Sequence, residues 1–465
     1  MTPPLAGIRR NSVDALLAAE RRRFAARNPR SAALAASSAA HWLQGVPLHW
    51  MSDWGLPFPL FFATARGAEI EDVDGHRLAD FCLGDSGAMF GHSPPAVVEA
   101  VRARAGAGLT TMLPGEDVAA AGELLARTFG LPFWQMTQTA SDANRAVLRW
   151  ARAVTGRPRV LVFEASYHGA VDDCFVALDG DRTVNRPGLV GQATDLSRVA
   201  VCVPFNDPDA LQEALRARDV ACVLAEPVMT NCGMVPPQPG FHEALRQLTR
   251  RYGTLLAIDE THCLSSGPGG YTRSAGLEPD FLVVGKAIAG GFPCAVYGFT
   301  AELEARIRGV LAVKPAGHSG IGTTLAGNPL ALAALCANLR HVMTPAAYEL
   351  MFAAAARLEA GLTALIDRAG LPWHVGRVGA RLEVNFTRRP PRNGREALAA
   401  RAGPLSDAIR LFLLDRGQLI TPFHDMMLLS PETTGPQVDG LVAAWAECMD
   451  ELLRGCAPGS DVHAV

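Results

Sequence analysis

Short aliphatic runs alternate with amphipathic segments between about residues 130 and 300. This alternation is typical of α/β units that build a parallel sheet. Four of the five runs are followed directly by polar or glycine-rich stretches, and ligands of open α/β sheets bind at the carboxyl ends of strands. We therefore expect the functional residues at these ends. The runs are Val160–Phe163, Val220–Ala225, Thr254–Ile258, Phe281–Val284 and Ala295–Phe299.

The two ends of the chain differ from this middle part, with helical patterns at 346–369 and 439–454 and a strand pattern at 381–386. Since 465 residues exceed one typical core, we predict two domains. Residues 1–75 contribute to a small domain and to the pocket, 76–340 form a large domain, and 341–465 complete the small one. The arginine-rich N-terminus has the composition of an organellar presequence, but its acidic residues favour a helix that packs on the small domain.

The composition argues for a small-molecule function. Charged residues make up 19% of the chain and the formal net charge is -3, so no electrostatic signal points to nucleic acid or to an anionic membrane. Ten cysteines without CxxC or His/Cys spacing predict reduced thiols and no metal site. No apolar run approaches the roughly 20 residues of a membrane helix. We expect a cytoplasmic protein with no nucleic acid or membrane partner.

A helix start follows residue 139, where Thr-Ala-Ser-Asp-Ala-Asn precedes apolar positions at helical spacing. Ser141 is a candidate N-cap, and Gly156 followed by Pro158 marks the end of the helix. Unpaired amides and the positive dipole end make such a start a site for a phosphate dianion. An ordinary capped helix explains the same residues.

Two other strand ends carry residues that suit a planar heterocycle. Tyr167, followed by His168 and Gly169, could stack on a ring, although plain packing explains it equally well. Asp259 closes the strand Leu255–Ile258, and a carboxylate there is costly to ionise unless it meets a cation such as a protonated pyridine nitrogen. A helix cap is one alternative for Asp259. A magnesium ligand is another, but the chain has no GxxxxGK[ST] motif.

Lys286 follows the apolar strand 281–284 and precedes small residues. Only one other lysine, Lys314, is present in a chain that otherwise uses arginine for positive charge. An apolar setting favours the neutral amine that forms Schiff bases. Further along, the glycine and threonine loop 320–329 (Gly-Ile-Gly-Thr-Thr-Leu-Ala-Gly-Asn-Pro) offers hydroxyls and amides to phosphate oxygens, or forms a structural turn.

Read in order, these elements resemble the class III aminotransferase family of fold-type I pyridoxal-phosphate enzymes. The branch concerned includes glutamate-1-semialdehyde aminomutase and β-amino acid transaminases. The resemblance covers about residues 60 to 430 and includes Glu226-Pro227-Val228 and the lysine 27 positions after Asp259. It implies a large domain with a mostly parallel seven-stranded sheet between helices, and a small α+β domain from both chain ends.

The resemblance also implies pyridoxal 5'-phosphate as cofactor and a role for each matching residue. Lys286 forms the internal aldimine and Asp259 pairs with the ring nitrogen. Thr324 reaches the cofactor phosphate of the neighbouring subunit, which implies a homodimer. The other cofactor-binding residues that the resemblance implies are Ala140, Ser141 and Asp142 at the phosphate and Tyr167 and His168 at the ring. It also implies Glu226 and Thr261, for which the match to the family pattern is weaker.

The chain departs from the family pattern at two places. Ala140 stands where the family has glycine, and Asp142 where it has glutamate. After Asp259 the chain lacks the family's Gly-Phe-Gly-Arg stretch. These changes leave the cofactor chemistry intact and put the usual substrate gating in doubt.

As function, we expect an aminotransferase that moves an amino group from an amino acid or amine to a keto acid by a ping-pong mechanism. A β-amino or aromatic amino acid is the expected donor, since Trp54 lies in an aromatic stretch that could line the pocket, and Arg381 could clamp a carboxylate. The alternative is an aminomutase or an amino acid epimerase with the same cofactor. A catalytically silent binding protein is a further alternative, but the chain carries no recognisable DNA-binding module.

Overall fold

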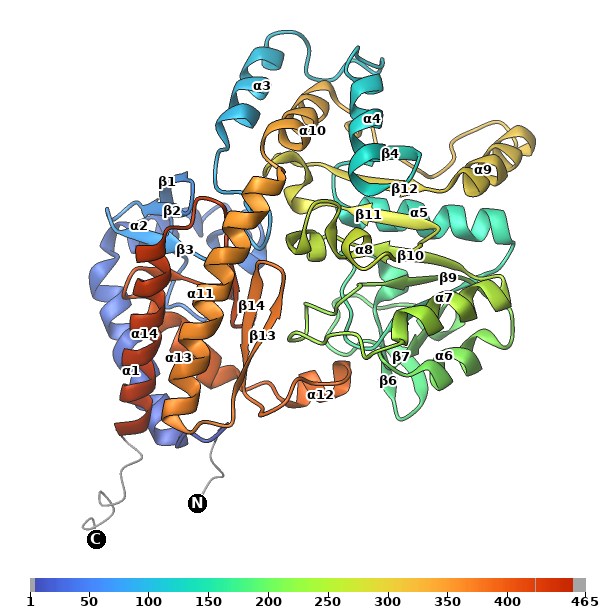
Figure 1. Ribbon diagram of the computed structural model, residues 1–465. Helices are drawn as coiled ribbons and strands as arrows, with labels where there is room; N and C mark the ends of the chain where they lie inside the picture. Colours follow the sequence, from blue (N-terminus) through green and yellow to red (C-terminus); the bar gives the residue numbers. More distant parts are fainter. Residues whose placement is uncertain (1–4, 423, 455–465) are drawn as a thin grey trace.

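The computed structural model describes residues 5–422 and 424–454 (Figure 1). Its centre is a seven-stranded sheet in the order β4-β12-β11-β10-β9-β5-β8. The pairs from β11 to β8 are parallel, and only β12 runs antiparallel to its neighbours. The strands are β4 (Phe133–Thr137), β5 (Arg159–Phe163), β8 (Ala200–Val203), β9 (Val220–Ala225), β10 (Leu255–Asp259), β11 (Phe281–Val284) and β12 (Ala295–Phe299).

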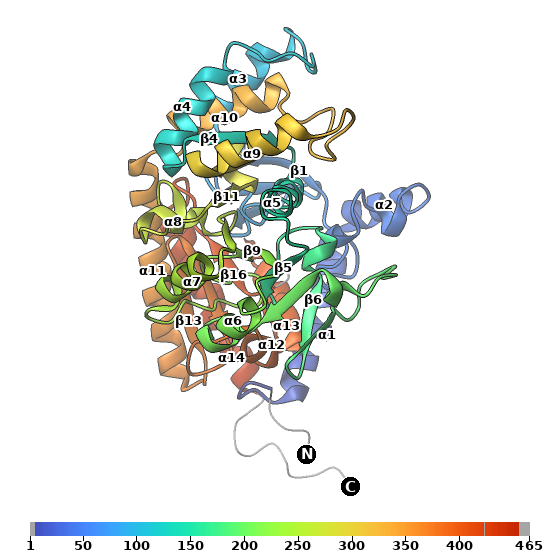
Figure 2. The ribbon, with the colours of Figure 1, turned by 90° about the vertical axis from the view of Figure 1, so that its right-hand side faces the viewer.

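Helices cover both faces of this sheet (Figure 2). Leu161 and Phe163 of β5 pack in one hydrophobic cluster, whereas Val160 and Val162 pack in the other. Because both faces are buried, the strands are continuous apolar runs rather than alternating ones. The first cluster includes α4 (Val118–Phe129), α6 (Pro208–Leu215), α7 (Phe241–Tyr252) and α10 (Pro329–His341), and the second includes α5 (Ala140–Thr155) and α9 (Ala301–Val313).

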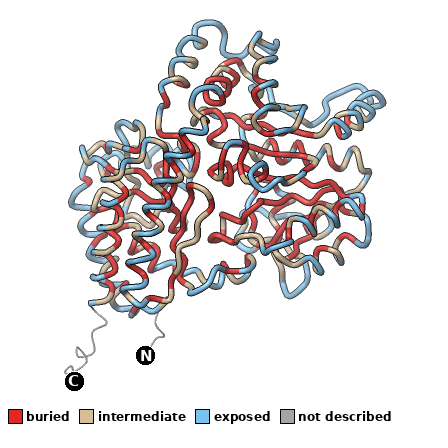
Figure 3. The backbone as a smooth tube through the Cα atoms, viewed as in Figure 1, coloured by how far each residue is buried: buried red, intermediate tan, exposed pale blue. Residues whose placement is uncertain are grey.

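The two ends of the chain fold together beside the large sheet (Figures 1 and 3). Helix α1 (Arg10–Arg27) packs on α13 (Gly403–Leu414) and α14 (Gly435–Arg454), so the predicted N-terminal helix on the small domain is confirmed. Strand β3 (Arg77–Asp80) also pairs in parallel with β15 (Gln418–Leu419). The exact borders at residues 75 and 340 stay a prediction.

The small domain holds two sheets, β1-β2-β3-β15 and the antiparallel β13-β14-β16, while β6 and β7 form a separate hairpin. These results confirm the predicted fold class. The remaining elements are α2 (Pro29–Ser38), α3 (Pro95–Ala105), α8 (Gly270–Ser274), α11 (Pro345–Ala369), α12 (Gly394–Ala399), β1 (Phe62–Arg66), β2 (Glu69–Asp72), β6 (Val176–Asp179), β7 (Arg182–Asn185), β13 (His374–Val378), β14 (Arg381–Asn385) and β16 (Met426–Leu428).

One local expectation is corrected, and two strands come in addition to those expected. The N-cap of α5 is Thr139 rather than Ser141, because the Thr139 hydroxyl accepts from the Asp142 amide at 3.1 Å. Strands β4 and β8 were not expected from the sequence. Gly156 does end α5 in the left-handed conformation, as predicted. Within the described ranges, no helix is both long and apolar enough to cross a bilayer, no metal-binding cluster of His, Cys, Asp or Glu is present, and all cysteines are free.

Candidate active site

The predicted strand ends converge on one cavity of about 350 Å³. Asp259 at the end of β10 is in register with Val283 of the neighbouring β11, and Lys286 follows shortly after. Helix α5 begins at the same edge, as expected for ligand sites at the carboxyl ends of parallel strands. Of the predicted site residues, eight line the cavity: Ala140, Ser141, Tyr167, His168, Glu226, Asp259, Thr261 and Lys286.

Lys286 has a left-handed backbone conformation, with φ of 49°, in a short 3-10 turn after Gly285. Such conformations are costly for residues other than glycine and cluster at functional sites. Its side chain is 29% exposed, and its Nζ lies 2.6 Å from Oδ2 of Asp85. The Nζ also forms a hydrogen bond with Nε2 of His262. The amine is therefore held by protein groups rather than free in solvent.

Asp85 is a site residue that the sequence analysis missed. Burial acts to raise the pKa of its carboxyl, but the positive charge of Lys286, with smaller effects of His262 and Arg381, outweighs burial and holds the pKa well below its usual range. Its loop is unusual because consecutive residues 83–86 all have positive φ. The only sequence signal was a pair of glycines, Gly84 directly before Asp85 and Gly87 two residues after it.

Asp259 is buried and accepts three hydrogen bonds. Asn144 Nδ2 donates at 2.8 Å, the Thr261 amide at 3.2 Å, and His168 Nδ1 lies 3.1 Å from the same carboxylate. Burial opposes ionisation, but the hydrogen bond and charge of His168, followed by the bonds from Thr261 and Asn144, lower the pKa of Asp259. The strand end thus carries a negative charge that faces the cavity.

The start of α5 leaves a tightly packed floor. The Ser141 hydroxyl accepts from the Ala170 amide at 2.9 Å, and a Cβ on Gly169 would lie only 2.1 Å from that hydroxyl. A Cβ on Gly285 would lie 2.8 Å from the Cβ of Ala140. The alanine that replaces the family's glycine therefore takes the space that Gly285 leaves free.

Glu226 anchors the backbone near the aromatic side chain. One carboxylate oxygen accepts from the Tyr167 amide at 3.1 Å, and the other accepts from the Thr230 amide at 3.0 Å. Burial raises the pKa of Glu226. Tyr167 itself is 46% exposed, so its ring has an open face toward the cavity.

Four predicted site residues do not line this cavity in the described chain. Asp142 is tied to the Thr139 hydroxyl at 2.9 Å, and Trp54 packs on a small-domain cluster with Phe24 and Leu78. Thr324 is exposed on the loop before α10. Arg381 is fully buried beside the site and donates to Ser86, while its Nε and Nη1 lack hydrogen-bond partners among the described groups.

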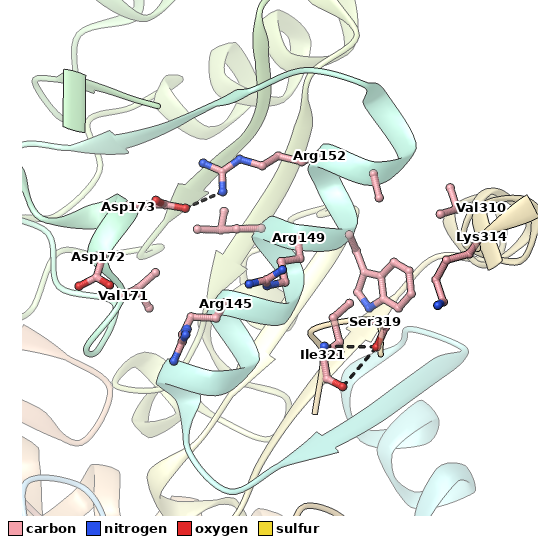
Figure 4. Close-up of a pocket in the computed structure, with 13 residues that line it drawn as sticks. Arg145, Arg149, Arg152, Val171, Asp172, Asp173, Val310, Lys314, Ser319 and Ile321 are labelled. Carbon is pink, nitrogen blue, oxygen red and sulfur yellow. Dashed lines mark hydrogen bonds and ion pairs between the residues drawn. The ribbon is translucent and has the colours of Figure 1, made fainter. Parts of the chain in front are cut away.

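A larger cavity, of about 620 Å³, lies beside α5 (Figure 4). Its lining includes three arginines of that helix, Arg145, Arg149 and Arg152, and Arg152 is paired with Asp173 at 2.5 Å. It holds Lys314 but no buried acid, and none of the predicted site residues line it. Although this cavity is larger, its lining therefore does not support it as the reaction site.

The smaller cavity fits pyridoxal 5'-phosphate. The α5 start offers free amides to a phosphate, Asp259 offers a negative charge to the ring nitrogen, and Lys286 offers an amine to the aldehyde. Two buried polar atoms on its wall, His168 Nε2 and Thr261 Oγ1, have no hydrogen-bond partner within the described residues. Buried polar atoms normally have a hydrogen-bond partner, and a group bound in this cavity could supply one for both.

Comparison with known proteins identifies the family. The model of the family "Aminotransferase class-III" matches residues 50–434. Glutamate-1-semialdehyde 2,1-aminomutase of Sorangium cellulosum is 35% identical over 398 residues, which cover 84% of this chain and 89% of that protein.

Solved structures agree with this result. A glutamate-1-semialdehyde-aminomutase from Pseudomonas aeruginosa PAO1 superposes with a TM-score of 0.94 at 49% identity, covering 96% of this chain and all (100%) of the other. A variant of that enzyme with a lysine replaced by alanine was solved in complex with PMP (TM-score 0.94, 48% identity, 96% and 100% coverage). A β-phenylalanine aminotransferase from Variovorax paradoxus superposes with a TM-score of 0.82 at 27% identity, covering 95% and 98%. This chain therefore belongs to the class III aminotransferase family and is a pyridoxal-phosphate-dependent enzyme.

Proposed function

We propose that this enzyme is an aminomutase, which moves the amino group between adjacent carbons of one molecule, with glutamate-1-semialdehyde as the substrate to test first. The observation that carries this proposal is the 49% identity, over nearly the whole of both chains, to an enzyme of that activity. This reading replaces our first expectation of transfer between two different molecules. Both readings use the same cofactor and the same lysine.

In the proposed reaction, bound pyridoxal phosphate withdraws electrons from the carbon that carries the amino group. Lys286 would attach the cofactor, and its released amine would take the proton from that carbon and return one to the neighbouring carbon, while the amino group moves to the neighbouring carbon and the carbonyl oxygen passes the other way by exchange with water. Asp259 stays ionised opposite the ring nitrogen, which its hydrogen bonds with His168 and Asn144 support.

We assign the remaining wall residues by their contacts. Ala140 and Ser141 bind the phosphate with the first amides of α5, and Asp142 supports them by fixing the Thr139 cap. Tyr167 covers the ring, and Glu226 holds the backbone of Tyr167 in place. His168 and Thr261 complete the ring pocket with their free polar atoms.

Arg381 is the proposed anchor of the substrate carboxylate. A buried guanidinium with free donors loses hydrogen-bonding energy unless an anion or another acceptor reaches it. Nε and Nη1 of Arg381 have no partner among the described groups, and its Nη2 is held by Ser86. Glutamate-1-semialdehyde carries one carboxylate that suits this site.

We further propose a homodimer in which Thr324 reaches the cofactor phosphate of the partner subunit. Within its own subunit, Thr324 lines a separate groove of about 520 Å³ with residues 110–114. Met112, Leu113 and Val118 in this groove are 78%, 73% and 48% exposed, which is unusual for large apolar side chains clustered on a free surface.

One assay separates the two activities. The cofactor-loaded enzyme is given glutamate-1-semialdehyde without any keto acid, and 5-amino-4-oxopentanoate is measured. The aminomutase proposal predicts this isomer in many turnovers per site. An aminotransferase would instead form no isomer. It would lose the amino group of the substrate only after pyruvate or 2-oxoglutarate is added, and the amino group would be recovered on that keto acid.

The aminotransferase remains the second candidate because one observation favours it. The β-phenylalanine aminotransferase shares the fold over 95% of this chain. For this reading, β-phenylalanine with 2-oxoglutarate is the pair to test, and formation of glutamate would support it.

A further inference from the structure

His262 occupies a central place that neither the sequence motifs nor the assigned site residues account for. It lies three residues after Asp259, is 6% exposed and lines the cavity. Its Nε2 forms a hydrogen bond with the Lys286 amine, and its Nδ1 lies 2.9 Å from the Thr230 hydroxyl oxygen. The imidazole therefore connects the reactive amine to a second buried group.

The direction of these hydrogen bonds follows from Glu226. Its Oε2 accepts from the Thr230 amide, from Asn231 Nδ2 and from the Thr230 hydroxyl, each at 3.0 Å. A hydroxyl has only one proton to donate. Because Thr230 donates that proton to Glu226, its oxygen must accept from Nδ1 of His262. The Nε2 of the neutral ring then carries no proton and presents a lone pair to Lys286.

The charges around the ring favour this neutral state. Burial lowers the pKa of His262 well below its ordinary value, and the charge of Lys286 from the turn after β11 lowers it further. Arg381 of β14 and His424 before β16 act in the same direction, while Asp85 from the loop after β3 opposes them. The ring therefore has a single proton to place, and Thr230 decides on which nitrogen.

We propose that His262 is a positioning residue for Lys286, oriented by Thr230 and Glu226. Its Nε2 accepts a hydrogen bond from the Lys286 nitrogen. This bond fixes the direction of the lysine nitrogen and stabilises the form in which that nitrogen carries a proton (the N–H form). Asp85 supplies the opposite charge at 2.6 Å, whereas His262 supplies a directed acceptor. The inference rests on the proposed attachment of the cofactor at Lys286.

The test removes the orienting hydroxyl and keeps the side-chain shape. In Thr230→Val, His262 is free to put its proton on Nε2, and Lys286 loses its acceptor. Because the acceptor stabilises the N–H form, we expect the pH midpoint of the visible band of the lysine-bound cofactor to fall by about one unit, the tenfold change that one hydrogen bond produces. We also expect kcat to fall about tenfold and KM to stay within about twofold.

Two matched variants control this test. Thr249→Val makes the same change at another fully buried threonine, on α7, whose hydroxyl donates to the Arg246 carbonyl at 2.9 Å. It should leave the midpoint and kcat unchanged. Thr230→Ser keeps the hydroxyl and should restore wild-type values. If Thr230→Val matches Thr249→Val in midpoint and kcat, the proposal is wrong.

A second measurement serves if Thr230→Val does not fold. The ring nitrogens of the wild-type holoenzyme are observed by NMR after 15N labelling of histidine, and the His262 signals are assigned by their loss in His262→Gln. A proton on Nδ1 is expected, and a proton on Nε2 overturns the proposal. Failure of the underlying assignment looks different, because the wild type itself would then show no lysine-bound cofactor.

Discussion

The Nζ atom of Lys286 lies 2.6 Å from Oδ2 of Asp85, although the two residues are 201 positions apart in the chain. The loop after β3 brings the acid to the strand end that carries the lysine. The candidate active site therefore includes a segment outside the large sheet, from the part of the chain that pairs with the small domain.

Replacement of Asp85 by asparagine removes the charge partner of Lys286. Because the pKa of Asp85 is held below its usual value, its ionised form contributes to stability above about pH 4, and the contribution is lost as the pH falls through the lowered pKa. We expect the cofactor-free variant to lose about 2 kcal/mol in free energy of unfolding. This loss should stay constant between about pH 5 and 7.

Urea denaturation at several pH values measures this effect. Asp179→Asn is the control, since Asp179 and Arg182 form a largely exposed ion pair, with 63% and 80% of their side chains accessible. Such a pair should contribute no more than about 1 kcal/mol. A loss that changes between pH 5 and 7 would show that another group, not the Asp85 carboxylate, titrates with stability.

Asp259→Asn keeps the size of the side chain but removes the negative charge opposite the ring nitrogen. We expect kcat to fall on the order of a hundredfold or more, because a preorganised charge at the reacting system is lost. The fold should persist, since Asn144 and His168 still have a polar partner. Steady-state kinetics with the cofactor-loaded variant checks this, and a kcat near that of the wild type would refute the assigned role.

Thr324→Val should weaken cofactor retention if this residue acts across a dimer. Mixed dimers provide the sharper test. In a mixed dimer, one subunit carries Thr324→Val and the other carries Lys286→Ala. One of its two sites then receives both intact residues, and activity should return in that site. The neighbouring Thr323→Val, which removes a hydroxyl 3.4 Å from Gln138, is the control. No recovery in purified mixed dimers would argue that Thr324 serves its own subunit or no site at all.

Trp54 should matter for stability and not for substrate affinity. It packs on a cluster with Phe24, Leu78 and Leu411 instead of lining the cavity. Trp54→Ala should cost about 2 kcal/mol, since the half-buried side chain leaves a partial cavity. Trp42, which is 53% exposed, provides a control that should cost little when changed to alanine. A higher KM for Trp54→Ala at unchanged stability would reverse this conclusion.

Local patterns in the sequence predicted much of the fold. The five apolar runs are strands with at most one residue of difference at either end, because burial on both faces of a parallel sheet leaves continuous apolar sequence. Strand β4 escaped detection because four of its five residues are exposed or only partly buried and one of them is Gln135. Ser141 was taken for the cap of α5 since Thr139 and Ser141 are both good capping residues, and only the backbone geometry distinguishes them.

The candidate site was predictable where a motif marked it, as for Lys286, Asp259 and Tyr167. Asp85 and His262 were missed because their importance comes from contacts between distant segments and not from local pattern. The stretch after Asp259 was read as a departure from the family, yet it is this departure that places an imidazole against the lysine. Trp54 was misleading for the opposite reason, since an aromatic stretch suits a core as well as a pocket.

The attachment point of the cofactor is the claim on which the account depends most. The chain has only two lysines, so borohydride reduction of the holoenzyme followed by peptide mass spectrometry gives an unambiguous answer. We predict a covalent cofactor adduct at Lys286 alone, and loss of both the adduct and the visible band in Lys286→Ala. An adduct at Lys314, whose amine contacts the carbonyls of Pro315 and Gly317 on the exposed side of the molecule, would contradict the account.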